Sequence, residues 1–485
     1  MKTKYLVFSL FLTIGIYGCS AVGPSEEPLN VIVINVDDLG WADLSVQGSS
    51  YYETPHIDGL ASSGIRFTNA YAAASICSPT RASLLTGRYP ARIGITDWIR
   101  SGFQGGEVPE DRENPTEYVG GTDKMLLNPP NPLWMERDEV TIAEILKEAG
   151  YTSAHIGKWH LGADAWYPEK QGFDLNIGGS DFGQPPSYFD PYYKENQGHI
   201  PTLEPRKEGE YLTDREADEA LQFIQEHQDQ PFFLHLAHYA VHTPIQAKEE
   251  IVERFGRKAK TNQKDPVYAA MVYSVDQAVG SILHKLRELN IDDRTLIIFT
   301  SDNGGLKSPE EGDQFTDNSP LRSGKGYPYE GGIRVPLIIS WPGVVGPATI
   351  SYEPVSSIDI TPTIAEAVGA NLPEDRNIDG RSLVDHLISG GREAIERNAL
   401  LWHFPHYRVG HTIPPYSIVR SGDWKLIKWW EGPSYELYNL HEDIGEKNNL
   451  ANEMSDKVIE MKTVLSDMLK KTNAKLPRTN PDFKK

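Results

Sequence analysis

The chain has 485 residues, of which 39% are hydrophobic and 24% are charged. A chain of this length exceeds one simple hydrophobic core, so we expect one large domain and a smaller second one. The formal net charge is −21, which argues against general nucleic-acid binding, because that function depends on Lys and Arg neutralising phosphates. An anionic substrate would need a locally positive pocket in this acidic background.

The first residues are predicted to be a lipoprotein signal peptide, residues 1–18. Lys2 and Lys4 form a basic start, and residues 5–17 form an apolar run that is short for a membrane span. The run ends in Ile16-Tyr17-Gly18-Cys19, which resembles the lipobox of bacterial lipoproteins, whose cysteine is acylated. Simple secretion with cleavage nearby is the alternative. In both cases we expect an exported protein, in the periplasm or on the surface of a Gram-negative bacterium, with no membrane contact beyond a lipid anchor.

Apolar, β-branched runs alternate with helical patterns over most of the chain. This alternation predicts an α/β fold with a large, mostly parallel sheet and helices on both faces. The predicted elements are strand 29–36, helix 141–149, strand 151–156, helix 213–227, strand 231–238, helix 266–289, strand 295–300 and strand 335–340.

The pattern changes after about residue 395, where short strand-like runs are separated by turns and followed by a helical stretch, 457–471. We expect a small antiparallel sheet with one helix, packed on the main domain. The predicted division is therefore an α/β domain over residues 28–395 and a C-terminal α+β subdomain over residues 396–485. The strand-like runs are 399–404, 416–420, 424–430 and 436–440.

Two stretches, 98–135 and 164–211, are rich in Gly, Pro and aromatic residues and have no clear periodicity. Disorder is the usual interpretation of such long loops. Aromatic residues are unusual in flexible segments, so we expect ordered loops that contact substrate. The aromatic residues are Trp98, Phe103, Trp134, Trp166, Tyr167, Phe182, Tyr188, Tyr192 and Tyr193.

Cys77 is the only cysteine besides Cys19, so it has no disulfide partner if Cys19 is lipidated or removed. Ser78 is a predicted N-cap of a short helix, which would place Cys77 at the positive end of the helix dipole. Arg81 would follow about one turn later on the same side. This arrangement offers a reactive atom beside an anion-binding site. A buried structural cysteine is the alternative interpretation.

Hard oxygen donors follow two of the predicted strands. Asp37 and Asp38 come after strand 29–36, and Asp302 and Asn303 come after strand 295–300. Each sequence alone is a common turn. Adjacent carboxylates repel one another unless a cation compensates, and oxygen-only ligands favour Ca²⁺ or Mg²⁺ over zinc. Because ligands bind beyond the carboxyl ends of parallel strands, the four residues predict a metal site.

Basic and proton-transferring residues follow other predicted strands. Lys158 and His160 come after strand 151–156, His242 comes after strand 231–238, and Lys325 lies in a glycine-flanked loop. A single His or Lys in a loop is usually a solvated surface residue. If these groups met Arg81 and the metal site at one edge of the sheet, they would form a pocket for a tetrahedral anion ester.

These motifs together resemble the type I, formylglycine-dependent sulfatases of the alkaline-phosphatase-like superfamily, and in particular bacterial carbohydrate sulfatases. Residues 77–88, with Cys77-x-Pro79-x-Arg81, match the family's first motif, and residues 150–162 match the second. The resemblance covers residues 29 to about 440. The other matching groups, in the family's order, are Asp37-Asp38, His242-Thr243-Pro244, Asp302-Asn303-Gly304 and Lys325 before Glu330-Gly331-Gly332.

The resemblance implies that a formylglycine-generating enzyme oxidises Cys77 to formylglycine (3-oxoalanine). One hydroxyl of its hydrate would attack sulfur and form a covalent sulfate intermediate, and loss of the second hydroxyl's proton would release sulfate. Ca²⁺, rather than Mg²⁺, would be held by Asp37, Asp38, Asp302, Asn303 and modified Cys77.

The resemblance also implies roles for the basic residues. Arg81 and Lys158 would stabilise the formylglycine and the sulfate oxygens, and His160 would assist collapse of the intermediate. His242, with Lys325, would bind sulfate and protonate the leaving oxygen.

The expected substrate is a sulfated polysaccharide or oligosaccharide. Residues 402–408 look like a substrate-subsite segment of carbohydrate-active sulfatases, which makes His403, His406 and Arg408 candidate substrate-binding residues. Two alternatives remain open. One is a formylglycine-dependent phosphodiesterase or phosphonate monoester hydrolase, and the other is a non-catalytic surface glycan-binding protein.

Overall fold

The computed structural model describes residues 28–99, 113–307, 314–408, 413–432 and 434–484. The predicted signal peptide, Cys19 and Phe103 lie outside these residues. Among the described residues, no helix is both long enough and apolar enough to cross a membrane.

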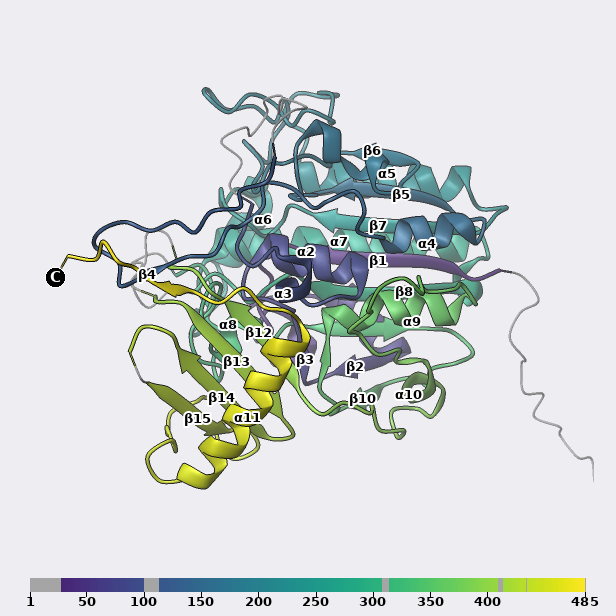
Figure 1. Ribbon diagram of the computed structural model, residues 1–485. Coiled ribbons are helices and arrows are strands. Elements are labelled where there is room, and N and C mark those ends of the chain that lie inside the picture. Colours follow the sequence, from purple (N-terminus) through teal and green to yellow (C-terminus); the bar gives the residue numbers. More distant parts are fainter. Residues whose placement is uncertain (1–27, 100–112, 308–313, 409–412, 433, 485) are drawn as a thin grey trace, which may run out of the picture.

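An eight-stranded sheet forms the centre of the molecule (Figure 1). In spatial order its strands are β10 (Thr349–Ser351), β2 (Ile65–Phe67), β9 (Leu337–Ser340), β8 (Thr295–Ser301), β1 (Asn30–Val36), β7 (Phe232–His238), β5 (Thr152–Gly157) and β6 (Leu175–Ile177). β1 pairs in parallel with both β7 and β8, and β5 pairs in parallel with β7 and β6. β9 is antiparallel to β2 and β8. The predicted mostly parallel α/β sheet is therefore confirmed.

Helices cover both faces of this sheet, and the alternation of side chains along β1 explains why. Ile32, Ile34 and Val36 point into the hydrophobic core on one face, whereas Val31 and Val33 point into the core on the other. Helices of the first face are α1 (Pro55–Ser63), α5 (Leu212–Glu226), α6 (Glu249–Gly256) and α7 (Pro266–Glu288). Those of the second are α2 (Cys77–Thr86), α4 (Ile142–Glu148), α9 (Ile360–Ala367) and α10 (Val384–Ile388).

A second, four-stranded sheet lies beside the first and is antiparallel throughout. Its strands are β12 (Leu400–Phe404), β13 (Tyr416–Ser421), β14 (Trp424–Trp429) and β15 (Tyr435–Asn439), and α11 (Ser455–Lys471) packs across it (Figure 1). The predicted C-terminal sheet and closing helix are confirmed. The domain boundary at residue 395 stays a prediction.

A buried ionic network joins the small sheet to α8 (Glu330–Ile333) of the main domain. Lys425 of β14 contacts the carboxylates of Glu330 (2.9 Å) and Glu446 (2.7 Å), and all three side chains are fully buried. Glu330, the first residue of α8 (Glu330–Ile333), also pairs with Arg334 at 2.8 Å and accepts a hydrogen bond from the Tyr71 hydroxyl. The network therefore fixes α8 against the C-terminal sheet.

The long aromatic loops are ordered where the structure describes them, but the expected substrate contact is wrong for most of their aromatic residues. Phe182, Tyr188 and Tyr192 are buried in the core that contains α5 and α7. Trp134 and Trp166 stack on each other, with ring centroids 4.0 Å apart, and are also buried. Burial of these large rings against the domain explains why loops without periodicity are ordered.

Candidate active site

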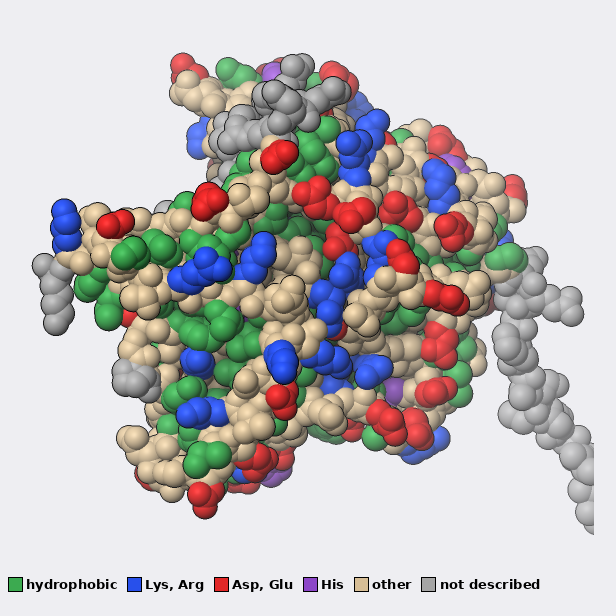
Figure 2. All heavy atoms as spheres, in the orientation of Figure 1, with side chains coloured by type: hydrophobic (Ala, Val, Ile, Leu, Met, Phe, Trp, Pro, Cys, Tyr) green, Lys and Arg blue, Asp and Glu red, His purple; other side chains and the backbone are tan. Residues whose placement is uncertain are grey.

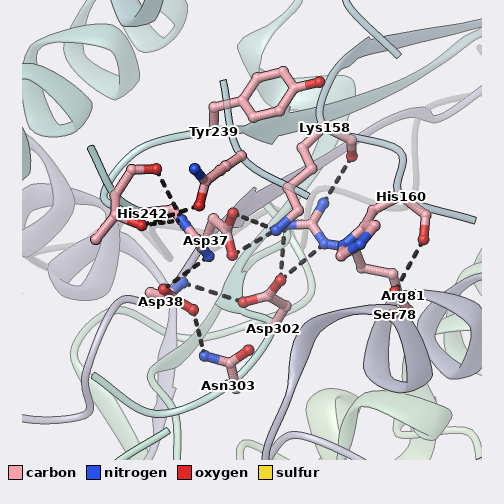
Figure 3. Close-up of polar contacts among 12 residues, drawn as sticks. Asp37, Asp38, Ser78, Arg81, Lys158, His160, Tyr239, His242, Asp302 and Asn303 are labelled. Carbon is pink, nitrogen blue, oxygen red and sulfur yellow. Dashed lines mark hydrogen bonds and ion pairs between the residues drawn. The ribbon is translucent and has the colours of Figure 1, made fainter. Parts of the chain in front are cut away.

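Candidate residues follow four neighbouring parallel strands at the edge where those strands end (Figure 3). Because the strands are in register, their ends bring together residues that are far apart in the sequence. Asp37 and Asp38 follow β1, Asp302 and Asn303 follow β8, Lys158 and His160 follow β5, and His242 lies four residues beyond β7.

Cys77 is the first residue of α2, and the helix N-cap is Ile76. The predicted capping role of Ser78 is wrong, because its hydroxyl donates to the His160 carbonyl and accepts from the Ile99 N–H, each at 3.0 Å. Cys77 is a buried free thiol. Burial raises the pKa of the Cys77 thiol although Lys158 and other cations oppose this. A protonated thiol is a poor nucleophile, so the unmodified side chain is not activated.

Two carboxylates bind the buried cations of the site. Lys158 Nζ lies 2.6 Å from Asp37 Oδ2. Arg81 Nε donates to Asp302 Oδ2 at 2.8 Å, and Nη2 lies 2.8 Å from the same oxygen as an ion pair. Arg81 Nη1 donates to the Lys158 carbonyl at 2.7 Å. Burial and the neighbouring Asp302 raise the pKa of Asp37, whereas Arg81 keeps the pKa of Asp302 low despite burial. The crowding of carboxylates is thus only partly compensated by protein cations.

Asp38 links the remaining groups of the site. Its Oδ1 lies 2.6 Å from Lys325 Nζ and accepts a hydrogen bond from Asn303 Nδ2 at 2.7 Å. His242 Nε2 lies 3.5 Å from its Oδ2. Lys325 lowers the pKa of Asp38 against the effect of burial. Asp38 has a φ of 60° and His160 has a φ of 62°, and non-glycine residues adopt this left-handed conformation at a cost in free energy.

Buried oxygen atoms at this edge could hold a metal ion. Asp37 Oδ1, Asp38 Oδ2 and Asn303 Oδ1 are buried and accept no hydrogen bond within the described residues. Ligand atoms of Asp37, Asp38 and His242 lie within 4.8 Å of one another. An unpartnered buried carboxylate oxygen is costly, and a hard cation would satisfy it. The donor set therefore fits a divalent cation that prefers oxygen.

Burial lowers the pKa of both histidines of the site. Burial, followed by Lys158, lowers the pKa of His160, and burial, followed by Lys325, lowers the pKa of His242 to about 3. His160 Nε2 contacts the Ile99 carbonyl at 3.3 Å, while its Nδ1 is buried and has no partner among the described residues. His160 therefore presents a lone pair that can accept a proton.

Glycines hold the loop that carries Lys325. A Cβ atom on Gly331 would lie 2.3 Å from the Ser323 carbonyl oxygen, and one on Gly332 would lie 2.2 Å from the Tyr327 carbonyl oxygen. Only glycine permits this approach, so α8 packs directly on the loop. Since α8 begins at Glu330, the buried ionic network supports the position of Lys325.

The structure separates the three residues predicted to bind substrate. Arg408 donates to the Lys325 carbonyl at 2.8 Å and therefore lies beside the site. His406 contacts the Thr96 hydroxyl at 2.8 Å, and His403 contacts the Ser417 hydroxyl at 2.7 Å and the Lys475 carbonyl at 3.1 Å, which places His403 within the C-terminal sheet and the segment after α11. The role of the three residues in substrate binding stays a prediction.

Sequence reasoning missed several residues that support the site. Gly183 touches His160, because a Cβ atom there would lie 2.8 Å from the imidazole ring. Lys425 and Glu446 lie outside every motif, and a lysine in a short strand gives no signal of burial. A signal was present in the alternation of side chains along β14, which places Lys425 on the same face of the strand as the buried Ile427.

Comparisons with known proteins agree with this geometry. A family model described as Sulfatase matches residues 29–370, and one described as N-sulphoglucosamine sulphohydrolase, C-terminal, matches residues 324–475. A protein named Sulfatase from Formosa agariphila is 32% identical over 97% of this chain and 94% of its own length. The N-acetylgalactosamine-6-sulfatase of Mus musculus is 33% identical over 91% of this chain and 80% of its own.

Solved structures share the fold. A crystal structure of Ps i-CgsB in complex with k-i-k-neocarrahexaose has a TM-score of 0.74 and 31% identity, over 91% of this chain and 93% of that one. The phosphonate monoester hydrolase of Agrobacterium radiobacter, at 20% identity and a TM-score of 0.66, shares the fold alone. The chain belongs to the sulfatase family and is a sulfuric ester hydrolase.

Proposed function

We propose that this chain removes sulfate from a sulfated polysaccharide or oligosaccharide by means of formylglycine, made from Cys77, and a bound Ca²⁺ ion. One observation carries the mechanism. Arg81, Lys158 and Lys325 surround the start of α2 at the end of the sheet, next to buried carboxylate oxygens that accept no hydrogen bond from any described residue. This combination suits the anionic sulfate group of an ester beside a divalent cation.

Asp37, Asp38, Asp302 and Asn303 would hold the cation, together with the modified Cys77. Their oxygen donors favour Ca²⁺, or Mg²⁺ as the second choice, over zinc. When bound, the cation supplies positive charge that polarises the sulfate ester and favours ionisation of the nucleophile. Formylglycine supplies, as its hydrate, a nucleophilic hydroxyl on a carbon that can later expel the sulfate.

The chain's own residues orient the ester and move protons. Arg81 and Lys158 bind sulfate oxygens, and their contacts with Asp302 and Asp37 hold both cations in place. His160 accepts a proton at Nδ1, the nitrogen that has no partner among the described residues. His242 and Lys325 lie on either side of Asp38, where both face the sulfate, and Lys325 delivers the proton to the leaving alcohol oxygen.

The proposed substrate class rests on the relatives. The mouse relative is named for sulfated N-acetylgalactosamine, and the structure of Ps i-CgsB contains a neocarrahexaose. Arg408 lies beside Lys325, where it could bind a second anionic group of a saccharide. We do not extend this role to His403, whose imidazole is bonded within the C-terminal part of the chain.

Export and maturation complete the proposal. The segment from Lys2 to Cys19 supports export, with lipidation of Cys19, to the periplasm or the cell surface. A formylglycine-generating enzyme would act on the segment that begins at Cys77, and would have to do so before that residue is buried in the fold.

Mass spectrometry of the peptide that contains Cys77 tests the nucleophile. Active protein is expected to show a loss of about 18 Da relative to cysteine, because the thiol is replaced by an aldehyde. Fully active protein with unmodified Cys77 would refute the mechanism. Turnover of matched sulfate, phosphodiester and phosphonate esters tests the reaction, and faster hydrolysis of the phosphorus esters by orders of magnitude would contradict the proposed substrate class.

A further inference from the structure

We propose that a cavity beside α11 is a second binding site for sulfated glycan, separate from the catalytic site. The cavity has a volume of about 510 Å³ and lies between the C-terminal half of α11 and the ends of β14 and β15. None of the candidate catalytic or metal-ligating residues lines it. The proposal rests on the substrate class proposed above and concerns a different part of the chain.

Charge is the first argument. Lys428, Lys462 and Lys470 line the cavity, and no carboxylate is among its lining residues. Within the described part of the chain, none of these lysines forms an ion pair with an acidic side chain, although the net charge of the chain is −21. Burial and the nearby Lys462 lower the pKa of Lys428, as expected where positive charges gather without compensation. An anionic ligand would relieve this repulsion.

The neighbouring cavity on the other side of α11 provides an internal comparison. It is lined by both acidic and basic residues, including Asp467, Glu396, Arg397 and Lys471. A basic lining is therefore a property of one side of α11 and not of the helix as a whole. Figure 2 shows Lys and Arg side chains interspersed with hydrophobic and acidic ones over α11 and the C-terminal sheet.

Aromatic rings are the second argument. Trp430 and Tyr435 line the cavity, and Trp430 Nε1 donates to the Ser417 hydroxyl at 2.9 Å, which fixes the orientation of its ring. Lys428 Nζ lies 3.5 Å from the centre of the Trp430 ring, and Lys462 Nζ lies 4.9 Å from that of Tyr435. A fixed ring next to an ammonium group can contact the apolar face of a sugar while the lysine binds its sulfate.

Such a site would hold a second segment of a polymeric substrate. Asn473, which also lines the cavity, adds a side-chain amide for sugar hydroxyls. Binding at two places raises the effective concentration of the polymer near the catalytic site without changing the chemistry there. The site should therefore affect long chains and leave short substrates unaffected.

The test uses the full chain with Lys462→Gln and Lys470→Gln together, since both side chains are exposed and the fold should tolerate the change. The matched control is Lys457→Gln with Lys471→Gln, which makes the same charge change on the same helix outside the cavity. Affinity is measured by calorimetry for a sulfated galactan polymer (carrageenan), for neutral agarose and for inorganic sulfate. Turnover of a short sulfated oligosaccharide is measured in parallel.

Loss of two charge-assisted contacts should weaken binding of the sulfated polymer by about tenfold in the cavity variant, and by less than about twofold in the control. Turnover of the short substrate should stay at the wild-type level in both. Equal weakening in both variants, or equal binding of agarose, would overturn the inference. If the cavity variant binds the polymer more weakly but the wild-type protein releases no sulfate, the second binding site is supported and the proposed function is refuted. If turnover is normal but the cavity variant binds the polymer as tightly as the wild type, the second binding site is refuted and the proposed function stands.

Discussion

Substitution of Lys425 by Met probes the ionic network that supports the catalytic loop. Lys425 is fully buried and contacts Glu330 at 2.9 Å and Glu446 at 2.7 Å. Glu330 would keep Arg334 and the Tyr71 hydroxyl as partners. Among the described residues, the Glu446 side chain would keep one partner, the backbone N–H of Glu330 at 2.6 Å, so most of the cost should come from this carboxylate.

Removal of one partner from a buried ion pair typically costs about 3–5 kcal/mol, because it leaves an uncompensated charge. We expect a loss of this size in the free energy of unfolding, measured by urea denaturation at pH 8. Burial already raises the pKa of Glu446 to about 7, although Lys425 opposes this. Loss of Lys425 should raise this pKa further. At pH 5 the folded variant would hold a proton on Glu446 and bury no uncompensated charge, so its loss in the free energy of unfolding should be smaller than at pH 8.

Two control variants distinguish the loss of the buried ion pair from a general effect of replacing lysine. Lys471→Met changes the same residue type at an exposed position and should cost less than about 0.5 kcal/mol. Adding Glu446→Gln to Lys425→Met removes the stranded charge and should recover more than half of the loss. A cost below about 1 kcal/mol for Lys425→Met, or no recovery in the double variant, would refute the argument that this pair carries a buried, compensated charge.

Three further results are expected. Cys77→Ala should abolish turnover and lower the free energy of unfolding by no more than about 1 kcal/mol, because a small buried side chain loses only its sulfur. A large loss of stability on urea denaturation would favour a structural cysteine. Chelation of divalent cations should abolish turnover and lower the melting temperature by a few degrees. Ca²⁺ at about 100 times its Kd should restore about 2.7 kcal/mol to the free energy of unfolding, which calorimetry would detect. Full activity after verified removal of the cations would contradict the metal site. Burial lowers the pKa of His403 from 6.5 to about 4. The stability contributed by neutral His403 is therefore fully present above pH 6.5 and declines as the pH falls towards 4, because in this range only the unfolded chain takes up the proton. His403→Gln should flatten this decline and leave KM unchanged, whereas a raised KM would indicate substrate contact.

The sequence was sufficient to predict five strands of the central sheet, because they are mostly apolar on both faces. It did not predict the three-residue strands β2, β6 and β10. Residues 29–36 and 295–300 are observed as Asn30–Val36 and Thr295–Ser301. Strand 335–340 was also predicted, but its antiparallel direction depends on pairing with β2 and β8. A strand's own side chains do not encode the direction of its neighbours.

The aromatic loops mark the limit of sequence reasoning. Their composition correctly indicated order, yet it could not distinguish rings that face a ligand from rings that face the core. Tyr188 and Tyr192 are buried in the core that contains α5 and α7, and the Tyr188 hydroxyl donates to the carbonyl of Tyr239, which is 51 residues away in the sequence. Burial of a large ring depends on which segments approach it, and local composition does not contain that information.

The sequence by itself determined which chemical groups this protein has: a thiol at a helix start, paired carboxylates after buried strands, and the lysines and histidines in its motifs. Only the tertiary structure decided that Lys158 lies 2.6 Å from Asp37 and Lys325 lies 2.6 Å from Asp38. It also separated Arg408, which contacts the Lys325 carbonyl, from His403, which lies only five residues away in the sequence. The physical reason is that strand pairing brings the ends of distant segments together, whereas His403 lies within β12 and Arg408 lies four residues beyond the end of that strand.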